Sequence, residues 1–155
     1  MESLKIQWLI NHKAWDKDWN LLFDETFHNI ITKAGKAEIA NLAGNVSTPT
    51  AFSYLANWSG TTAATSDDTT LQTENDNTNG FGRASATVSR VTTTSPNDTL
   101  QLVKQWTATW NVTVNEIGIF NAASVWTMLW RQVLWATKNF GASDTYQVTY
   151  KIIFS

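Results

Sequence analysis

Apolar and polar residues alternate along most of the chain with a period of two, the pattern of a β-strand with one buried face. In the last segment, for example, Tyr146, Val148 and Tyr150 share one side while Thr and Gln residues occupy the other. This alternation, or a short apolar run between turn residues, predicts about eight strands. They are expected at 4–10, 21–27, 51–58, 83–94, 100–112, 114–121, 127–134 and 145–154.

Two polar stretches interrupt this pattern. Trp15–Asn20 is rich in Asp and Asn and indicates a turn, which would join the first two strands in a hairpin. Residues 59–82 contain few apolar side chains and predict a long loop. Loops of this length are usually functional or mobile.

One segment has a helical period instead. Apolar residues recur every three to four positions across residues 29–43, with Asn29 available as a cap. Gly44 and Asn45 supply the stop signal that is expected just past a helix end. Gly35 weakens the middle by about 1 kcal/mol relative to Ala. The pattern predicts a single α-helix near residues 29–43.

These elements predict a mainly β protein, an antiparallel β-sandwich or barrel of about eight strands with one helix. A length of 155 residues fits a single domain, 1–155, with its own core. Within this domain, an N-terminal hairpin and helix (1–45) would precede a β-sandwich (46–155).

Composition narrows the possible partners and chemistry. The formal charge is −2 and the 11 basic residues are scattered, so we expect no nucleic-acid partner. The absence of Cys excludes disulfides and thiolate metal sites. No apolar run has the length of a signal peptide or a transmembrane helix, so we expect no membrane partner.

Candidate catalytic and metal-binding residues are few. His12 and His28 lack the spacing of a triad or of a metal pair, and we expect both to be structural or solvated. The polar loop carries carboxylates that could offer oxygen ligands to calcium: Asp67, Asp68, Glu74 and Asp76. They lack the spacing of a calcium-binding EF-hand loop, which favours a solvated loop. The sequence thus predicts a non-enzymatic protein without a cofactor or metal.

Nine Trp residues are unusual for a chain of this size. Trp106 and Trp110 share one face of an expected strand, which favours the core. Trp126, Trp130 and Trp135 belong to a run with aromatic residues on both faces, and one side of it is hard to hide in a single core. Because Trp is enriched at binding hot spots, we expect these three at an exposed or inter-subunit surface.

Several segments resemble a family of small structural proteins of tailed-phage particles, and the likeness runs from about Phe27 to Ser155. The segments are Leu55–Ala64, Asp68–Glu74, Arg83–Arg90, Asn115–Ala123 and Asp144–Ser155. Glu116–Phe120 also resembles part of the N-terminal attachment domain of tail-collar fibre proteins. The family pattern implies Gly or Ala at three positions that are Trp here, which suggests a contact surface. The expected interface residues are Trp58, Trp126, Trp130 and Trp135.

The resemblance implies a virion structural protein that is made in the host cytoplasm. The leading hypothesis is a capsid decoration (cement) protein that binds major capsid subunits and stabilises the head, as a homodimer or homotrimer. One alternative is a tail or baseplate component, or a fibre adaptor. Another is a carbohydrate-binding module of the tail, with Trp58 or Trp126 as a stacking platform.

Overall fold

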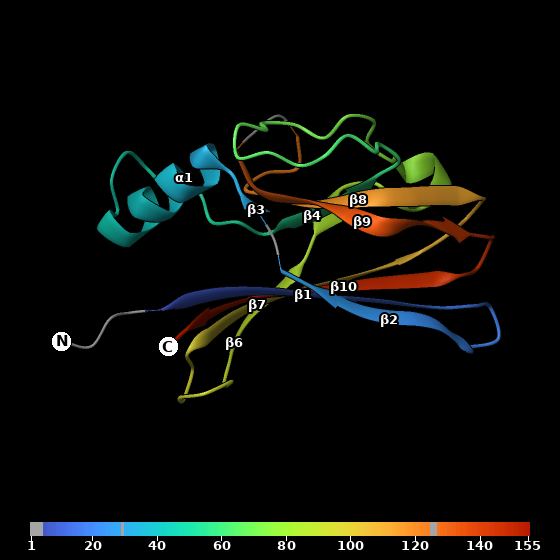
Figure 1. Ribbon diagram of the computed structural model, residues 1–155, viewed down its shortest axis with the longest axis horizontal. Helices are drawn as coiled ribbons and strands as arrows, with labels where there is room; N and C mark the ends of the chain where they lie inside the picture. The colour runs from blue at the N-terminus through green and yellow to red at the C-terminus, as the bar shows by residue number, and fades with distance from the viewer. Residues whose placement is uncertain (1–4, 29, 125–126) are drawn as a thin grey trace.

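Two antiparallel sheets of five strands pack face to face in the computed structural model, which describes residues 5–28, 30–124 and 127–155 (Figure 1). Sheet A has the order β2-β1-β10-β7-β6 and sheet B the order β3-β9-β8-β4-β5. The strands of sheet A are β1 (Ile6–Trp15), β2 (Leu21–Phe27), β6 (Thr87–Val91), β7 (Thr99–Thr107) and β10 (Thr145–Phe154). Those of sheet B are β3 (Ile30–Ile31), β4 (Tyr54–Trp58), β5 (Ala84–Ser85), β8 (Val112–Phe120) and β9 (Met128–Phe140).

The mainly β sandwich expected from the sequence is confirmed, and the barrel alternative is not adopted because both sheets keep open edges. Two expected strands are divided between the sheets. The segment 83–94 crosses from sheet B to sheet A at Ala86, whose backbone N–H donates to the Ser53 carbonyl at 2.8 Å. The segment 100–112 ends as a strand of sheet A at Thr107 and resumes in sheet B at Val112.

The expected N-terminal hairpin is present, and it is an integral part of sheet A. β1 is longer than expected and runs from Ile6 to Trp15, where it pairs with β2 on one side and β10 on the other. The turn that follows is organised by Asp16, whose carboxylate accepts hydrogen bonds from the backbone N–H groups of Asp18 and Asn20, both at 2.9 Å.

The expected helix is present but starts later than residue 29. Helix α1 spans Lys33–Gly44, because Thr32 caps it by accepting a hydrogen bond from the Gly35 N–H at 2.9 Å. The two residues before Thr32 form β3 instead of a first helical turn. Asn29, the expected cap, lies outside the described residues. Asn45 ends the helix in the left-handed conformation, in agreement with the expected stop signal.

Gly35 lets α1 approach sheet B closely. A Cβ atom at this position would collide with the backbone carbonyl of Leu129 in β9. Although Ala favours a helix over Gly, we expect Gly35→Ala to lower the free energy of unfolding by about 1–3 kcal/mol, because backbone must move to admit the methyl group. Urea denaturation of this variant measures the change. Lys36→Ala, at an exposed position of the same helix, is the control, and a stabilised Gly35→Ala protein would contradict the prediction.

The core has two parts. The larger part lies between the sheets and includes Ile10, Leu102 and Tyr150. A smaller cluster contains Trp58 and Leu71 and lies on the outer face of sheet B, where the loop 59–82 crosses it (Figure 1). Sheet B is therefore covered on both faces.

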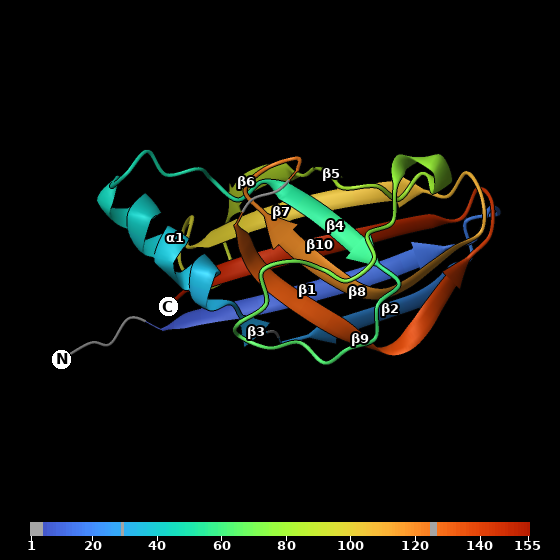
Figure 2. The same ribbon diagram turned by 90° about the horizontal axis from the view of Figure 1, so that it is seen from above.

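Seen from above, α1 lies at the end of the sandwich where the C-terminus is found (Figure 2). Within the described part of the chain, no helix is long and apolar enough to cross a membrane.

Candidate functional site

Two of the four tryptophans expected at an interface lie inside the protein. Trp58 is 2% exposed and Trp130 is 0% exposed. The Trp58 ring packs near Phe120 at a centroid distance of 6.0 Å, and the Trp130 ring packs near Tyr150 at 5.4 Å. The expectation that these two rings are exposed is therefore wrong, because sheet B is buried on both faces. Trp126 lies outside the described residues.

Three other indole rings are exposed. Trp135 on β9 is 76% exposed and stands edge-on to Phe27, with ring centroids 4.5 Å apart. Trp110, in the connection between β7 and β8, is 72% exposed, and Trp19, in the turn after β1, is 67% exposed. Of the four expected interface residues, Trp135 is thus the one that the described structure places on the surface.

Trp106 and Trp110 were both expected in the core, and the structure confirms this for Trp106 alone. Trp106 is buried in the core, and its indole N–H donates to the Gly82 carbonyl at 2.9 Å. Trp110 is not in the core, because β7 ends at Thr107 and Trp110 no longer follows its alternation.

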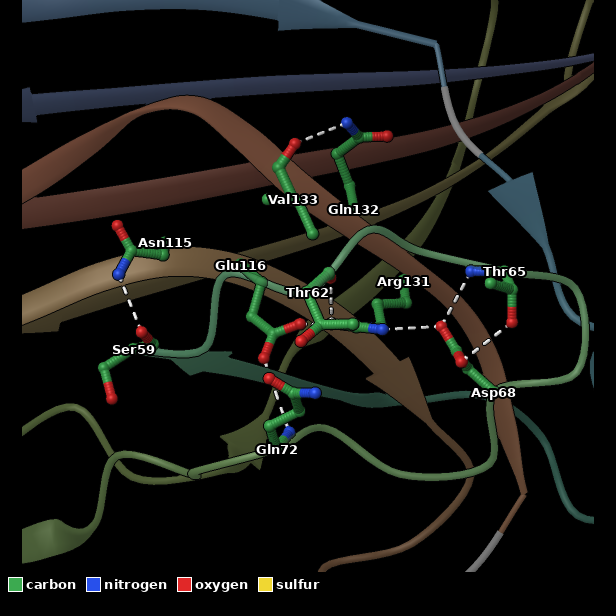
Figure 3. Close-up of polar contacts among 10 residues, drawn as sticks. All are labelled: Ser59, Thr62, Thr65, Asp68, Gln72, Asn115, Glu116, Arg131, Gln132 and Val133. Carbon is green, nitrogen blue, oxygen red and sulfur yellow. Dashed lines mark hydrogen bonds and ion pairs between the residues drawn. The ribbon is translucent and has the colours of Figure 1, made fainter.

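Arg131 of β9 binds the loop 59–82 through hydrogen bonds on the outer face of sheet B (Figure 3). Its side chain is 3% exposed and forms an ion pair with Glu116 of β8, whose side chain is fully buried. It also donates to Asp68 at 2.6 Å and to the Thr62 carbonyl at 2.6 Å, both of which belong to the loop. One guanidinium group thus links two strands of the sheet to two points of the loop.

Neighbouring hydrogen bonds complete this attachment. The Asn115 amide donates to the Ser59 carbonyl at 2.7 Å, and the Thr65 backbone N–H donates to Asp68 at 2.8 Å (Figure 3). Burial alone would lower the pKa of Arg131, but the hydrogen bonds that it donates to Asp68 and Glu116 raise it above its ordinary value. Burial alone would raise the pKa of Asp68, yet hydrogen bonds from Thr65 and Arg131 lower it. Arg131 and Asp68 are therefore charged at neutral pH.

The loop carboxylates considered as calcium ligands have protein partners. Asp68 binds Arg131, Asp67 pairs with Lys33 at 2.6 Å, and Glu74 pairs with Arg83 at 3.0 Å. Among the residues that the structure describes, no group of three or more His, Cys, Asp or Glu side chains is placed to hold a metal ion.

His12 lies in a buried polar cluster that joins the two sheets. Its Nδ1 is 3.0 Å from the Tyr146 hydroxyl and its Nε2 is 3.1 Å from Glu25 of β2. Lys138 of β9 donates to the same carboxylate at 2.6 Å. Burial lowers the pKa of His12 to about 4, although the hydrogen bond with Glu25 favours the charged ring. His12 is therefore neutral at pH 7.

An apolar groove of about 430 Å³ opens between α1 and sheet A. Trp8, Leu100 and Ile152 line it from the sheet, and Ile39 and Leu42 line it from the helix. Its lining residues are all apolar, which distinguishes it from the loop side of the molecule.

Sequence reasoning missed both the Arg131 cluster and the groove. A charged residue inside the apolar segment 127–134 was a signal that Arg131 has a buried partner, since unpaired buried charges are rare. Its partners were not predictable, because Asp68 is 63 residues away in the sequence. The groove depends on where α1 packs, which the helical pattern alone does not determine.

Comparison of the chain with protein-family models, with curated proteins and with solved structures finds no match.

Proposed function

We propose that this protein is a structural subunit of a tailed-phage particle, that it acts by binding neighbouring protein subunits, and that it decorates the capsid. The observation that carries the proposal is the exposure of Trp19, Trp110 and Trp135, none of which belongs to the core between the sheets. Trp is enriched at binding hot spots, where its large ring becomes buried against a partner. The assignment to a phage particle rests on the segments that resemble phage structural proteins.

Such a subunit would stabilise a shell by mass action. A protein that binds the assembled shell, and not the separate capsid subunits, shifts the equilibrium toward the assembled state in proportion to RT ln(1 + [L]/Kd). The same exposed rings could also meet across the axis of a symmetric dimer or trimer, which is the oligomer that we propose. Neither role requires chemistry on a substrate, in line with a non-enzymatic protein.

A reconstruction of purified particles of the encoding phage, with mass spectrometry of their proteins, tests the proposal. We expect the sandwich on the outer surface of the head, in contact with major capsid subunits. A position on the tail would overturn the decoration role and favour a baseplate component or fibre adaptor. Absence from the particle would overturn the whole proposal.

The carbohydrate-binding alternative requires an exposed ring, and Trp58, one of its two expected stacking residues, does not provide one. The Trp58 ring is buried, so it cannot stack on a sugar in this fold. Its second platform, Trp126, lies outside the described residues.

Trp135→Ala is expected to weaken binding to particles by at least about tenfold, the loss that is typical of a hot-spot Trp. The melting temperature of the isolated protein should change little, because the ring is 76% exposed. Co-sedimentation of the variant with particles that lack the protein measures the binding. Val46→Ala, which truncates an apolar residue that is 53% exposed, is the control.

Unchanged particle binding by the Trp135, Trp110 and Trp19 alanine variants would contradict a role for these rings. A loss of binding that only parallels a loss of melting temperature would assign Trp135 to folding instead.

A further inference from the structure

The floor of the groove between α1 and sheet A is formed by side chains that are aligned across neighbouring strands. Trp8 of β1 stands opposite Ile152 of β10, and Ile152 stands opposite Leu100 of β7. Residues directly opposite each other in a sheet point to the same face. These three side chains therefore form one row across three strands, and all of them line the groove.

Arg90 ends this row. It stands opposite Leu100 in the pairing of β6 with β7, so its side chain emerges on the same face as the groove floor. Val88, two residues away on β6, lines the groove as well. The floor of the groove is thus apolar, and Arg90 places a positive charge beside it, at the end of the row.

The Arg90 guanidinium is exposed and unpaired. Within residues 5–28, 30–124 and 127–155, no hydrogen bond, ion pair or ring contact involves its side chain. By contrast, Arg83 pairs with Glu74 and Arg131 pairs with Asp68 and Glu116. Arg90 is therefore an arginine whose donors are free to meet a ligand.

We propose that the groove binds an amphipathic anion, a single aliphatic chain with a carboxylate head group, with the chain on the apolar floor and the carboxylate against Arg90. The row from Trp8 to Arg90 crosses three strand spacings, about 14 Å, which suits an extended alkyl chain. The volume of about 430 Å³ lies in the range of small-molecule sites. A guanidinium group binds a carboxylate through two parallel hydrogen bonds.

The depth of the site favours a slender chain over a flat protein surface. Helix residues Ile39 and Leu42 face the floor residues across the groove, so a ligand is covered from two sides. None of the three exposed tryptophans, Trp19, Trp110 and Trp135, lines the groove. The inference is therefore independent of the proposed role in a phage particle, and either can fail alone.

Titration of the full chain with laurate, and separately with the uncharged analogue dodecanol, tests the proposal by calorimetry. We expect one laurate molecule to bind per chain. Arg90→Gln is expected to weaken laurate binding by about tenfold, the loss of a charged hydrogen bond, and to leave dodecanol binding unchanged. Lys17→Gln, in the turn after β1, is the matched control and should bind both ligands as the parent does.

Two groove variants test the apolar part of the site. Val88→Asp on the floor and Leu42→Asp on the helix should each abolish binding of both ligands. Both residues are already exposed, at 45% and 36%, so the substitutions are compatible with folding, and melting curves check this.

The absence of saturable laurate binding would overturn the proposal. An equal loss of laurate and dodecanol binding in Arg90→Gln would overturn the role of the anionic head group. If laurate does not bind and the groove variants instead lose attachment to phage particles, the groove is a protein-docking surface and the proposal is wrong.

Discussion

Replacement of Arg131 by methionine is expected to lower the free energy of unfolding by about 3–5 kcal/mol, because it leaves a buried charge without its partner. Glu116 is fully buried, and Arg131 is its ion-pair partner. The substitution also removes the hydrogen bonds to Asp68 and to the Thr62 carbonyl. Urea denaturation followed by circular dichroism measures the loss.

Lys33→Met is the matched control for this experiment. Lys33 also pairs with a loop carboxylate, Asp67 at 2.6 Å, but both side chains are 70% exposed. Exposed pairs contribute about 0–1 kcal/mol, so the control should unfold almost as the parent does. Equal losses in the two variants would contradict the idea that burial of Glu116 sets the cost of removing Arg131.

A second substitution separates the buried charge from the lost hydrogen bonds. In the double variant Arg131→Met with Glu116→Gln, the uncompensated carboxylate is absent, so part of the lost stability should return. The loop should remain loosened, because neither Asp68 nor the Thr62 carbonyl regains the hydrogen bond that Arg131 donates. Faster proteolysis within residues 59–82 at restored stability would show that Arg131 holds the loop as well as the fold.

The strands were largely predictable because alternation is a local property. The expected strand 21–27 coincides with β2, and the expected strand 145–154 coincides with β10. The start of the helix was misplaced because Thr32 is the residue that caps it. Pattern alone could not show this, since the Thr32 hydroxyl is also fixed by a hydrogen bond to the Met128 carbonyl, 96 residues away.

The interface residues were less predictable, because exposure depends on what covers each face. Aromatic residues on both faces of a strand indicated a surface, and for Trp130 this inference failed because sheet B is buried on both sides. Its outer face is covered by the loop 59–82. Leu71 of this loop packs in the small cluster with Trp58, and Arg131 holds the loop from the sheet through Asp68. A polar loop gives little sign that it covers a hydrophobic cluster.

Trp19 and Trp110 are exposed because of the local backbone geometry at each position. Trp19 adopts a positive φ of 64° in the turn after β1, which turns its ring away from the alternation of the strand. Trp110 follows the end of β7, where the chain leaves sheet A for sheet B. The turn that contains Trp19 was expected from the sequence, whereas the end of β7 before Trp110 has no sequence signal as clear as an Asn-Gly turn.

Acidification is expected to destabilise the protein well before its carboxylates become protonated, and the cause is His12. Burial lowers the pKa of His12 to about 4 in the folded protein, against 6.5 in an unfolded chain. Between these values the unfolded state binds a proton that the folded state does not, so stability falls as the pH falls. The loss should reach roughly 3 kcal/mol at pH 4, of which about 2 kcal/mol is lost by pH 5.

The window from pH 7 to pH 5 isolates this histidine. Burial alone would raise the pKa values of Glu25 and Asp68, but the hydrogen bonds that they accept from Lys138 and Thr65 lower them below their ordinary values. They therefore lose their stabilising charge at lower pH. Urea midpoints measured across the window should therefore be nearly constant for His12→Gln, although this variant also loses stability at pH 7 with the Tyr146 and Glu25 contacts. His28→Gln, which removes an exposed histidine, should keep the slope of the parent. A flat parent profile would mean that the buried ring accepts a proton in the folded state at a higher pH, with Glu25 stabilising its charge. A slope that survives in His12→Gln would mean that another group causes the loss of stability.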